Sequence, residues 1–595
     1  MCLSVSRMTD VPNPFWQGAK LGPDGVRFRL WAPGCQDVSL RLESENRLVA
    51  MERQLDGFFE TFVPGIGAGA LYCYQLSDGM LVPDPASRFQ PNDVHGPSEV
   101  IDPKAYTWKT PWSGRAWEDV VLYELHVGAF TPEGTFQGVE SKLDYLVTLG
   151  VTAIEIMPIA DFPGRWNWGY DGVLIYAPDS SYGRPEDFKA LVDAAHARGV
   201  AVILDVVYNH FGPEGNYLPI YATDFFTARH STPWGNAINF AAGPARQFIV
   251  DNAKYWIDEF RLDGLRLDAV HAIFDDGPKH MLAELAEQLR LDASRPLHLI
   301  LENESNEPSW LTRQGRDPVH YTAQWNDDVH HVLHVAATHE RSGYYEAYEG
   351  DTDLLAKALS EGFAYQGQWM PYRKTSRGGP SAFLPPNAFI SFIQNHDQIG
   401  NRAFGERLSV LVGVEALRAL AAIYLLSPQT PMIFMGEEWS AREPFPFFCD
   451  VGADLAEAVR KGRREEFARF PEFKDPERRD LIPDPLAQDT FLLAKLDWSK
   501  ATESNLSHYR ALLKARRKHI TPLSREIRQG GDAVIFGAGA VRVRWRTAGR
   551  LLVLDANLSS RRVDFPAARG RVIWCEGNTN NVMGPWSVRW SLEDE

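Results

Sequence analysis

Four segments of the chain each join an apolar run to acidic side chains. They are residues 202–210, which include Asp205, and residues 264–268, 299–302 and 392–397. Apolar, β-branched runs of this kind are typical of buried strands, and a parallel α/β barrel gathers catalytic groups at the C-terminal ends of its strands. The pattern therefore predicts one carboxylate site that combines Asp268, Glu302 and Asp397.

Three such carboxylates could hydrolyse a glycosidic bond with retention of configuration. That reaction needs one carboxylate as nucleophile and one carboxylic acid as proton donor, about 5 to 5.5 Å apart. A third carboxylate can keep the proton on the donor by like-charge repulsion and can bind sugar hydroxyls. Arg266 lies two residues before Asp268, so strand alternation predicts that both side chains share one face. There the guanidinium would favour the ionised form that a nucleophile requires.

Each of these residues also has a structural interpretation. An acidic residue at a strand end often caps the following helix, Asp205 and His210 could brace a loop, and His396 could be a buried structural histidine. A second glutamate, Glu304, follows Glu302 on the same predicted face, and strand parity does not choose between the two. The occurrence of all these segments in one order along the chain favours a catalytic role for these residues over a structural one.

The elements that would position these residues alternate regularly in the middle of the chain. Strand-like runs are predicted at residues 120–125, 152–158, 201–207, 264–267, 297–301, 321–325, 388–392 and 432–434. Amphipathic helices are predicted at residues 138–149, 185–198, 245–260, 279–289 and 507–517. This order is typical of a (β/α)8 TIM barrel, with a long insertion after the third strand at residues 211–243.

The two flanking regions alternate with the period of two that strands show. Residues 26–31 and 38–42 do so near the start, and residues 541–545, 551–554 and 571–574 near the end. The sequence therefore predicts an α/β protein of three domains. These are an N-terminal β-sandwich at 1–108, a central (β/α)8 TIM barrel at 109–522 and a C-terminal antiparallel β-domain at 523–595.

Length and charge limit the class of function. A chain of 595 residues exceeds the usual size of a single core, so several domains are expected. The 61 lysines and arginines stand against 78 acidic residues, which gives a net charge of -17. Such a charge repels phosphate backbones and anionic lipid surfaces. We therefore expect neither nucleic acid nor a membrane as a partner.

The cysteines and the apolar stretches indicate the compartment. The five cysteines, Cys2, Cys35, Cys73, Cys449 and Cys575, are scattered and lack short paired spacings, so neither a disulfide framework nor a zinc site is predicted. Residues 1–16 lack the basic and apolar pattern of an export signal, and the apolar stretch 412–435 is interrupted by charged residues and a proline. We expect a cytoplasmic protein.

Taken in order, the four segments resemble the signature regions of the α-amylase superfamily of glycoside hydrolases, which follow the third, fourth, fifth and seventh barrel strands. By this resemblance, Asp268 is the nucleophile, Glu302 the general acid/base and Asp397 the transition-state stabiliser. Glu304 remains the alternative acid, although the position of Glu302 directly at the strand end favours Glu302.

The same resemblance implies substrate contacts for Tyr170, His210, Arg266 and His396. Tyr170 would stack on the sugar whose bond is cut, and its alternative interpretation is a core aromatic residue. Asn209 occupies a position used for calcium in some α-amylases, but no companion cluster of oxygen ligands is evident in the sequence. We therefore expect no required metal and no cofactor.

Further stretches resemble the maltooligosyltrehalose trehalohydrolase family within this superfamily. They are residues 123–130, 205–215, 301–304, 395–402 and 434–439. Members of that family cut the α-1,4 bond next to a terminal trehalose and release free trehalose, so the resemblance implies maltooligosyl trehalose and related α-glucans as substrates. The N-terminal sandwich resembles the carbohydrate-module-like domain of this family and of branching and debranching enzymes. A branching or debranching enzyme and a non-catalytic glucan-binding protein remain the alternatives.

Overall fold

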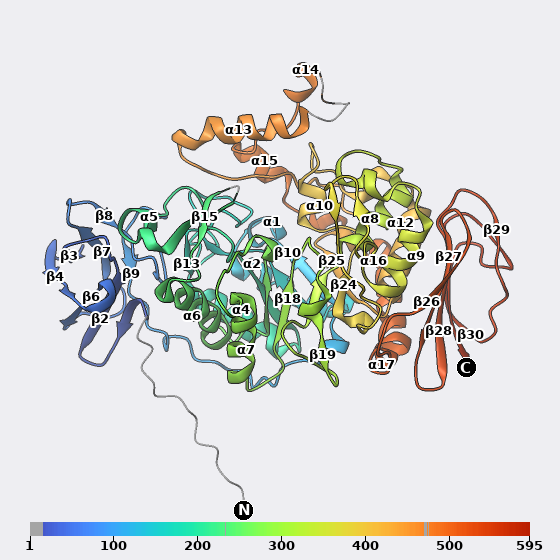
Figure 1. The fold of residues 1–595 in the computed structure, drawn as a ribbon, viewed down its shortest axis with the longest axis horizontal. Helices are drawn as coiled ribbons and strands as arrows, with labels where there is room; N and C mark the ends of the chain where they lie inside the picture. Colours follow the sequence, from blue (N-terminus) through green and yellow to red (C-terminus); the bar gives the residue numbers. More distant parts are fainter. Residues whose placement is uncertain (1–15, 233, 469–472, 474, 595) are drawn as a thin grey trace, which may run out of the picture.

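The computed structural model describes residues 16–232, 234–468, 473 and 475–594. Cys2 and residues 1–15 of the segment considered for an export signal lie outside these residues. Three parts lie side by side along the long axis of the molecule, with the barrel between the N-terminal and C-terminal β-structures (Figure 1).

The central part is a closed barrel of eight parallel strands, as the sequence predicts. Around the barrel the strands run in chain order: β10 (Leu122–Leu125), β11 (Ala153–Ile156), β14 (Ala201–Val206), β17 (Gly264–Leu267), β18 (His298–Leu301), β21 (Ala323–Trp325), β24 (Phe389–Ser391) and β25 (Thr430–Phe434). All of them overlap the predicted runs. A Cβ at Gly264 would lie 2.0 Å from the carbonyl oxygen of His298, so only glycine lets β17 and β18 approach this closely.

Helices surround the barrel and largely follow the predicted ranges. They include α4 (Pro185–Ala197), α6 (Gly243–Glu259), α7 (Met281–Asp292) and α16 (Glu503–Ala515), whereas no helix was predicted where α12 (Val414–Leu426) forms. The prediction of one helix over 138–149 is wrong, because the chain forms α2 (Phe136–Glu140) and α3 (Leu143–Leu149). At the end of the first helix the Lys142 N–H donates to the carbonyl oxygen of Val139 at 3.0 Å in a tighter turn, and the Ser141 hydroxyl donates to the carbonyl oxygen of Gly138 at 2.7 Å.

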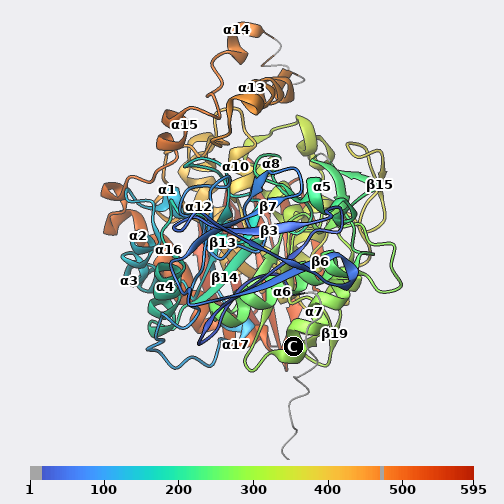
Figure 2. The ribbon, with the colours of Figure 1, turned by 90° about the vertical axis from the view of Figure 1, so that its left-hand side faces the viewer.

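The N-terminal part is a sandwich of two antiparallel sheets. One sheet contains β1 (Gly18–Leu21), β2 (Gly25–Trp31), β6 (Phe58–Pro64) and β5 (Glu52–Arg53), and the other β4 (Arg47–Ala50), β3 (Val38–Leu42), β7 (Leu71–Leu76), β8 (Leu81–Val82) and β9 (Ser98–Glu99). Figure 2 shows these strands in front of the barrel. The sandwich contacts the insertion, since the Gly34 N–H donates to the carbonyl oxygen of Tyr221 at 3.0 Å.

The insertion after β14 forms α5 (Leu218–Tyr221) and a hairpin of β15 (Phe226–Thr232) and β16 (Gly235–Ile238). Phe225, just before the hairpin, packs against Trp31 of the sandwich with ring centroids 6.4 Å apart. The insertion thus joins the N-terminal sandwich to the rim of the barrel.

The C-terminal part is a five-stranded antiparallel sheet. In spatial order it contains β26 (Asp532–Gly537), β27 (Ala540–Arg546), β28 (Arg550–Asn557), β32 (Ser587–Asp594) and β30 (Arg571–Glu576). The Trp590 indole N–H donates to the carbonyl oxygen of Ala422 on α12 at 2.9 Å, so a barrel helix anchors this sheet.

Two further groups of helices were not predicted from the sequence. Between β21 and β24 lie α8 (Asp327–Thr338) and α9 (Thr352–Glu361), and α9 packs against β26 and β27 of the C-terminal sheet. After β25, α13 (Ala453–Ala468), α14 (Pro476–Arg479) and α15 (Gln488–Leu493) project from the barrel (Figures 1 and 2).

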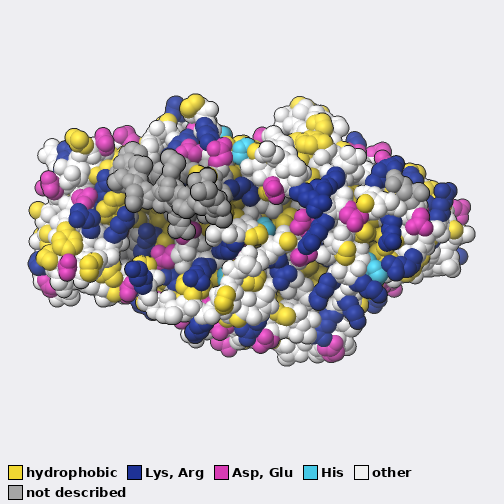
Figure 3. All heavy atoms as spheres, turned by 90° about the horizontal axis from the view of Figure 1, so that it is seen from below, with side chains coloured by type: hydrophobic (Ala, Val, Ile, Leu, Met, Phe, Trp, Pro, Cys, Tyr) yellow, Lys and Arg dark blue, Asp and Glu magenta, His cyan; other side chains and the backbone are white. Residues whose placement is uncertain are grey.

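The surface carries both signs of charge. Figure 3 shows lysine and arginine side chains interspersed with acidic ones on one face, although the net charge of the chain is -17. Within the described ranges, no helix is long and apolar enough to cross a membrane, and the four cysteines described are free.

Candidate active site

The predicted site residues lie where the barrel strands end. The deepest ionic contacts centre on Arg266, whose fully buried guanidinium stands on β17. Its Nη1 lies 2.7 Å from Asp205 Oδ2 and 3.0 Å from Asp268 Oδ1, and its Nη2 lies 2.7 Å from Glu302 Oε2. One arginine therefore connects carboxylates from the ends of the third, fourth and fifth strands. The predicted contact between Arg266 and Asp268 is confirmed.

Asp268 directly follows β17, and its backbone continues the strand ladder because its N–H donates to the carbonyl oxygen of Val206 at 3.1 Å. The Asn209 side-chain amide donates to Asp268 Oδ2 at 2.8 Å. With Arg266 on Oδ1 and Asn209 on Oδ2, both carboxylate oxygens are held, and the side chain is 12% exposed. Asp268 is thus fixed and still accessible.

The structure separates the two candidate acids. Glu302 Oε2 accepts the Ala269 N–H at 2.9 Å in addition to its contact with Arg266, and the side chain is 14% exposed. Glu304 lies beyond the end of β18, forms an ion pair with Arg373 and is 45% exposed. Because β18 ends at Leu301, the alternation of side chains along the strand does not determine the direction of Glu304. Of the two glutamates, only Glu302 contacts Arg266.

The seventh strand leads to His396 and Asp397 at the start of α10 (His396–Gly400). His396 Nε2 lies 3.6 Å from Asp397 Oδ1, and its Nδ1 lies 2.5 Å from Glu124 Oε1. Asp397 is the most exposed of the three predicted catalytic carboxylates, at 34%. It thus remains open to a ligand while its histidine neighbour is buried.

Tyr170 is not a simple core residue, because it joins two parts of the site. Its hydroxyl donates to Asp205 Oδ2 at 2.6 Å, and its ring stacks on His396 with centroids 5.1 Å apart. Burial raises the pKa of Asp205 to about 7, although Arg266 opposes the rise.

His210 closes the same side of the site. Its Nε2 contacts the carbonyl oxygen of Tyr170 at 2.9 Å, and burial lowers its pKa to about 4, so the ring is neutral at neutral pH. Trp234 of the insertion stacks on His210 with centroids 3.7 Å apart while 46% of the tryptophan stays exposed. An exposed indole face beside the carboxylates suits stacking on a sugar ring.

Beside Asp397 lies a cavity of about 210 Å³, whose lining includes Glu340, Tyr344, Asn401, Arg402, Phe404 and Phe473. Arg402 forms two hydrogen bonds of 2.9 Å with Glu340. The Asn401 amide reaches Asp397 Oδ1 at 3.5 Å and so joins the cavity to the site. Aromatic walls with a few fixed polar groups are typical of a small-molecule site.

Sequence reasoning missed three further carboxyl groups near the site. Glu124 on β10 and Glu155 on β11 face the interior of the barrel, and Asp327 opens α8 between the strands that lead to Glu302 and Asp397. Glu124 lies in the stretch 123–130, which resembles the trehalohydrolase family, but the apolar residues around Glu124 in the sequence indicate only a strand. The signal in all three cases would be an acidic residue inside or directly after a predicted barrel strand.

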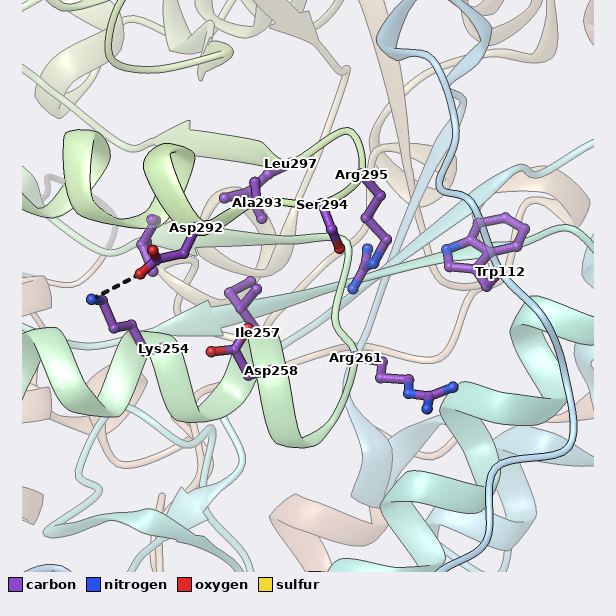
Figure 4. Close-up of a pocket in the computed structure, with 11 residues that line it drawn as sticks. Trp112, Lys254, Ile257, Asp258, Arg261, Asp292, Ala293, Ser294, Arg295 and Leu297 are labelled. Carbon is purple, nitrogen blue, oxygen red and sulfur yellow. Dashed lines mark ion pairs between the residues drawn. The ribbon is translucent and has the colours of Figure 1, made fainter. Parts of the chain in front are cut away.

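A second hollow, of about 340 Å³, has a lining that includes Lys254 and Asp292 (Figure 4). Its residues Arg261, Arg295 and Leu297 come before β17 and β18, whereas the carboxylates come after these strands. Lys254 and Asp292 pair at 3.1 Å, and Arg295 pairs with Asp263 at 2.7 Å. The four side chains are thus paired with one another. Because the hollow lies before the strands and the carboxylates lie after them, the hollow is separate from the carboxylate site.

Three family descriptions match the chain. "Alpha amylase, catalytic domain" matches residues 87–220, "Carbohydrate-binding module 48 (Isoamylase N-terminal domain)" matches residues 16–88, and a domain of unknown function matches residues 528–590. The first of these contains Tyr170, Asp205 and His210.

Curated relatives cover most of the chain. The chain is 44% identical over 515 residues to the malto-oligosyltrehalose trehalohydrolase of Saccharolobus solfataricus, covering 86% of this chain and 88% of the relative. It is 43% identical to the enzyme of the same name from Deinococcus radiodurans, covering 95% and 94%. Among solved structures, a putative alpha amylase from Salmonella typhimurium superposes with a TM-score of 0.94 at 46% identity, covering 97% of this chain and 99% of that one.

Proposed function

The chain belongs to the malto-oligosyltrehalose trehalohydrolases, glycoside hydrolases of the α-amylase superfamily, and we propose that it hydrolyses the α-1,4-glucosidic bond next to the terminal trehalose of maltooligosyl trehalose. The products are free trehalose and a maltooligosaccharide with one new reducing end. The reaction would serve trehalose formation from α-glucans.

The chemistry proceeds in two displacements with overall retention. The Asp268 carboxylate attacks the anomeric carbon, the bond to the glycosidic oxygen breaks, and Glu302 gives its proton to that oxygen as trehalose leaves. Water then attacks the anomeric carbon of the glycosyl-enzyme, Glu302 takes up the proton, and Asp268 leaves as a carboxylate. No proton or electron pair remains unaccounted for.

One observation carries this assignment above all. Asp268 and Glu302 contact the two terminal nitrogens of the same buried guanidinium, so the nucleophile and the acid are held side by side by Arg266. Retaining glycosidases need this proximity of two carboxyl groups. Glu304 makes no such contact, which supports Glu302 as the acid.

The remaining residues would hold the sugar and the charge of the transition state. Asp397 supplies the third carboxylate, and His396 lies beside it. Tyr170, whose ring stacks on His396, and His210, which contacts the Tyr170 carbonyl oxygen, lie next to these groups, and there we place the ring of the sugar whose bond is cut. Hydrogen bonds from such groups to sugar hydroxyls strengthen in the transition state and lower the barrier by several kcal/mol.

Proton NMR of the digest of maltooligosyl trehalose tests the proposed reaction. We expect free trehalose and a new reducing end that first forms as the α anomer and then mutarotates. The Asp268→Asn variant should keep its fold and lose turnover, and a fluorinated α-glucosyl substrate should label Asp268 in the wild type. A β anomer as first product, or a label on Asp397, would contradict the mechanism.

We also propose that the reaction takes place in the cytoplasm. The four cysteines in the described part of the chain are free, as expected for a reducing compartment. Cell fractionation tests this, because trehalose release should follow a cytoplasmic marker enzyme. Activity in the medium or an extracytoplasmic fraction would contradict it.

A further inference from the structure

Beneath the rim, the barrel interior holds a buried acid that the proposed reaction does not use. We propose that Glu124 is a positioning residue, which fixes the His396 imidazole so that its Nε2 faces Asp397. This inference rests on the proposed function only in taking Asp397 as part of the reaction site. Glu124 itself is 1% exposed, so we infer that it acts through His396 and not on the substrate.

Glu124 holds His396 at two points. The Nδ1–H of the ring donates to Glu124 Oε1 at 2.5 Å, and the backbone N–H of His396 donates to Glu124 Oε2 at 3.2 Å. Both side chains are 1% exposed. Glu124 lies on the first strand and His396 follows the seventh, so closure of the barrel brings the two together across 272 residues of sequence.

Two aromatic side chains pack against the His396 ring and restrict its orientation. Tyr170 stacks on it at 5.1 Å, and Trp168 meets it edge to face at 5.5 Å. Because Nδ1 is committed to Glu124, the only ring nitrogen left for Asp397 is Nε2, 3.6 Å from Oδ1. Glu124, His396 and Asp397 therefore form a line of carboxylate, imidazole and carboxylate.

A positive charge on the His396 ring would be stabilised by the carboxylates of Glu124 and Asp397 on either side of it. Burial lowers the pKa of His396, but Asp397 and Glu124 more than offset this effect and raise it to about 9. The other charged or titratable groups around the ring are Arg266 on β17, Glu155 on β11 and His126 after β10. A protonated ring carries an N–H on both nitrogens, one bonded to Glu124 and one facing Asp397.

Glu155 provides a matched control. It pairs with Glu124 in the strand register and is also 1% exposed, but neither of its carboxyl oxygens has a hydrogen-bond partner among the described residues. Burial and the neighbouring Glu124 raise the pKa of Glu155 well above its usual range, so it is a neutral acid. Replacing Glu155 by glutamine therefore changes no charge beside His396.

Glu124→Gln tests the proposal, because it keeps an acceptor for Nδ1–H and removes the charge. We expect kcat at pH 8 to fall at least tenfold with little change in KM, and the alkaline limb of the kcat profile to move down by about one pH unit or more. Glu155→Gln should leave that limb in place. An unshifted limb in Glu124→Gln, or the same shift in both variants, would overturn the proposal.

A double-mutant cycle tests whether Glu124 acts through His396. If it does, adding Glu124→Gln to the His396→Gln variant should lower kcat little further. If the two fold-losses in kcat multiply in the double variant, Glu124 has a role independent of His396, which would contradict the proposal. Glu124→Asp, which keeps the charge and should keep the alkaline limb, replaces Glu124→Gln if that variant does not fold. The pH profile can be measured on any α-glucan that is turned over, so a failure to release trehalose would contradict the proposed function and leave this test intact.

Discussion

At the scale of single residues, the site depends on Arg266. Its guanidinium contacts three carboxylates and also lies over the Trp325 ring, 3.9 Å from the centroid. A planar fork with several donors is needed to reach acids from three strands, and lysine offers only one point charge. Arg266 is thus both a scaffold for the carboxylates and their counter-charge.

We expect Arg266→Met to destabilise the protein and to abolish activity. Removing one partner of a buried ion pair leaves Asp205 uncompensated, which costs about 3 to 5 kcal/mol. Thermal unfolding should show a clear fall in Tm, and the double variant Arg266→Met with Asp205→Asn should recover part of it. An unchanged Tm in the single variant would mean that the buried ion pair does not stabilise the fold.

The two glutamates should differ in their dependence on the leaving group. A general acid matters most for a poor leaving group, so Glu302→Gln should harm natural glucans severely and spare the glycosylation step with an activated aryl glycoside. Glu304→Gln, the matched control, should show no such dependence. The measurement is kcat/KM of both variants on a natural glucan and on an activated aryl glycoside. If Glu304→Gln and not Glu302→Gln shows the dependence on the leaving group, Glu304 is the acid.

At the scale of elements, the strands could be predicted because each is a short apolar run with a polar end. The predicted helix at 138–149 was wrong because the backbone turns at Ser141 and Lys142 between α2 and α3, while the apolar pattern continues across the turn. Helices α13 to α15 were missed because they project from the barrel and are poor in apolar residues, so that in α13 only Arg463 and Phe467 are buried. The boundaries at 108 and 522 remain predictions.

The site was predictable only in part for a related reason. Asp268, Glu302 and Asp397 follow their strands and so stand out from the apolar runs. Glu124 and Glu155 lie within strands, where their role depends on which side chains face them after the barrel closes. The partner of Glu124 is 272 residues away, and local sequence carries no sign of it.

The loop after β24 should contribute to substrate binding through Arg402. Its two hydrogen bonds to Glu340 shape the cavity beside Asp397. We expect Arg402→Ala to raise KM for maltooligosyl trehalose, because Glu340 and the cavity wall lose the side chain that fixes them. Arg418→Ala, at an exposed ion pair with Glu576, is the control. A KM unchanged in both variants would remove this cavity from the substrate site.

At the scale of the whole molecule, the pH dependence of stability should reflect two buried glutamates where barrel and outer helices meet. Glu437 accepts the hydroxyls of Tyr424 on α12 and Tyr509 on α16, and Glu438 accepts those of Tyr123 and Tyr145. Burial raises the pKa of each glutamate to about 7. The folded state therefore holds protons that the unfolded state loses above its ordinary pKa of about 4.3.

The contribution of the two glutamates to the free energy of unfolding is fully present below about pH 4. It is lost as the pH rises through their folded-state pKa of about 7. We expect Glu437→Gln, which is neutral at every pH, to raise Tm by a few degrees at pH 8, equivalent to about 1 to 3 kcal/mol, and not at pH 4. Calorimetry at both values tests this, with the exposed Glu503→Gln as control. An equal effect of Glu437→Gln at both pH values would contradict the assignment.

The central claim is that the site selects a trehalose end. A site shaped for both rings of this disaccharide would leave polar groups unpaired around a linear maltose unit, which lowers transition-state binding. The most direct measurement compares kcat/KM for maltooligosyl trehalose with that for a maltooligosaccharide of equal length, with product analysis. We predict much faster cleavage of the former, free trehalose as product and no branch transfer to amylose. Equal rates with maltose as the main product, or new α-1,6 linkages, would contradict the claim.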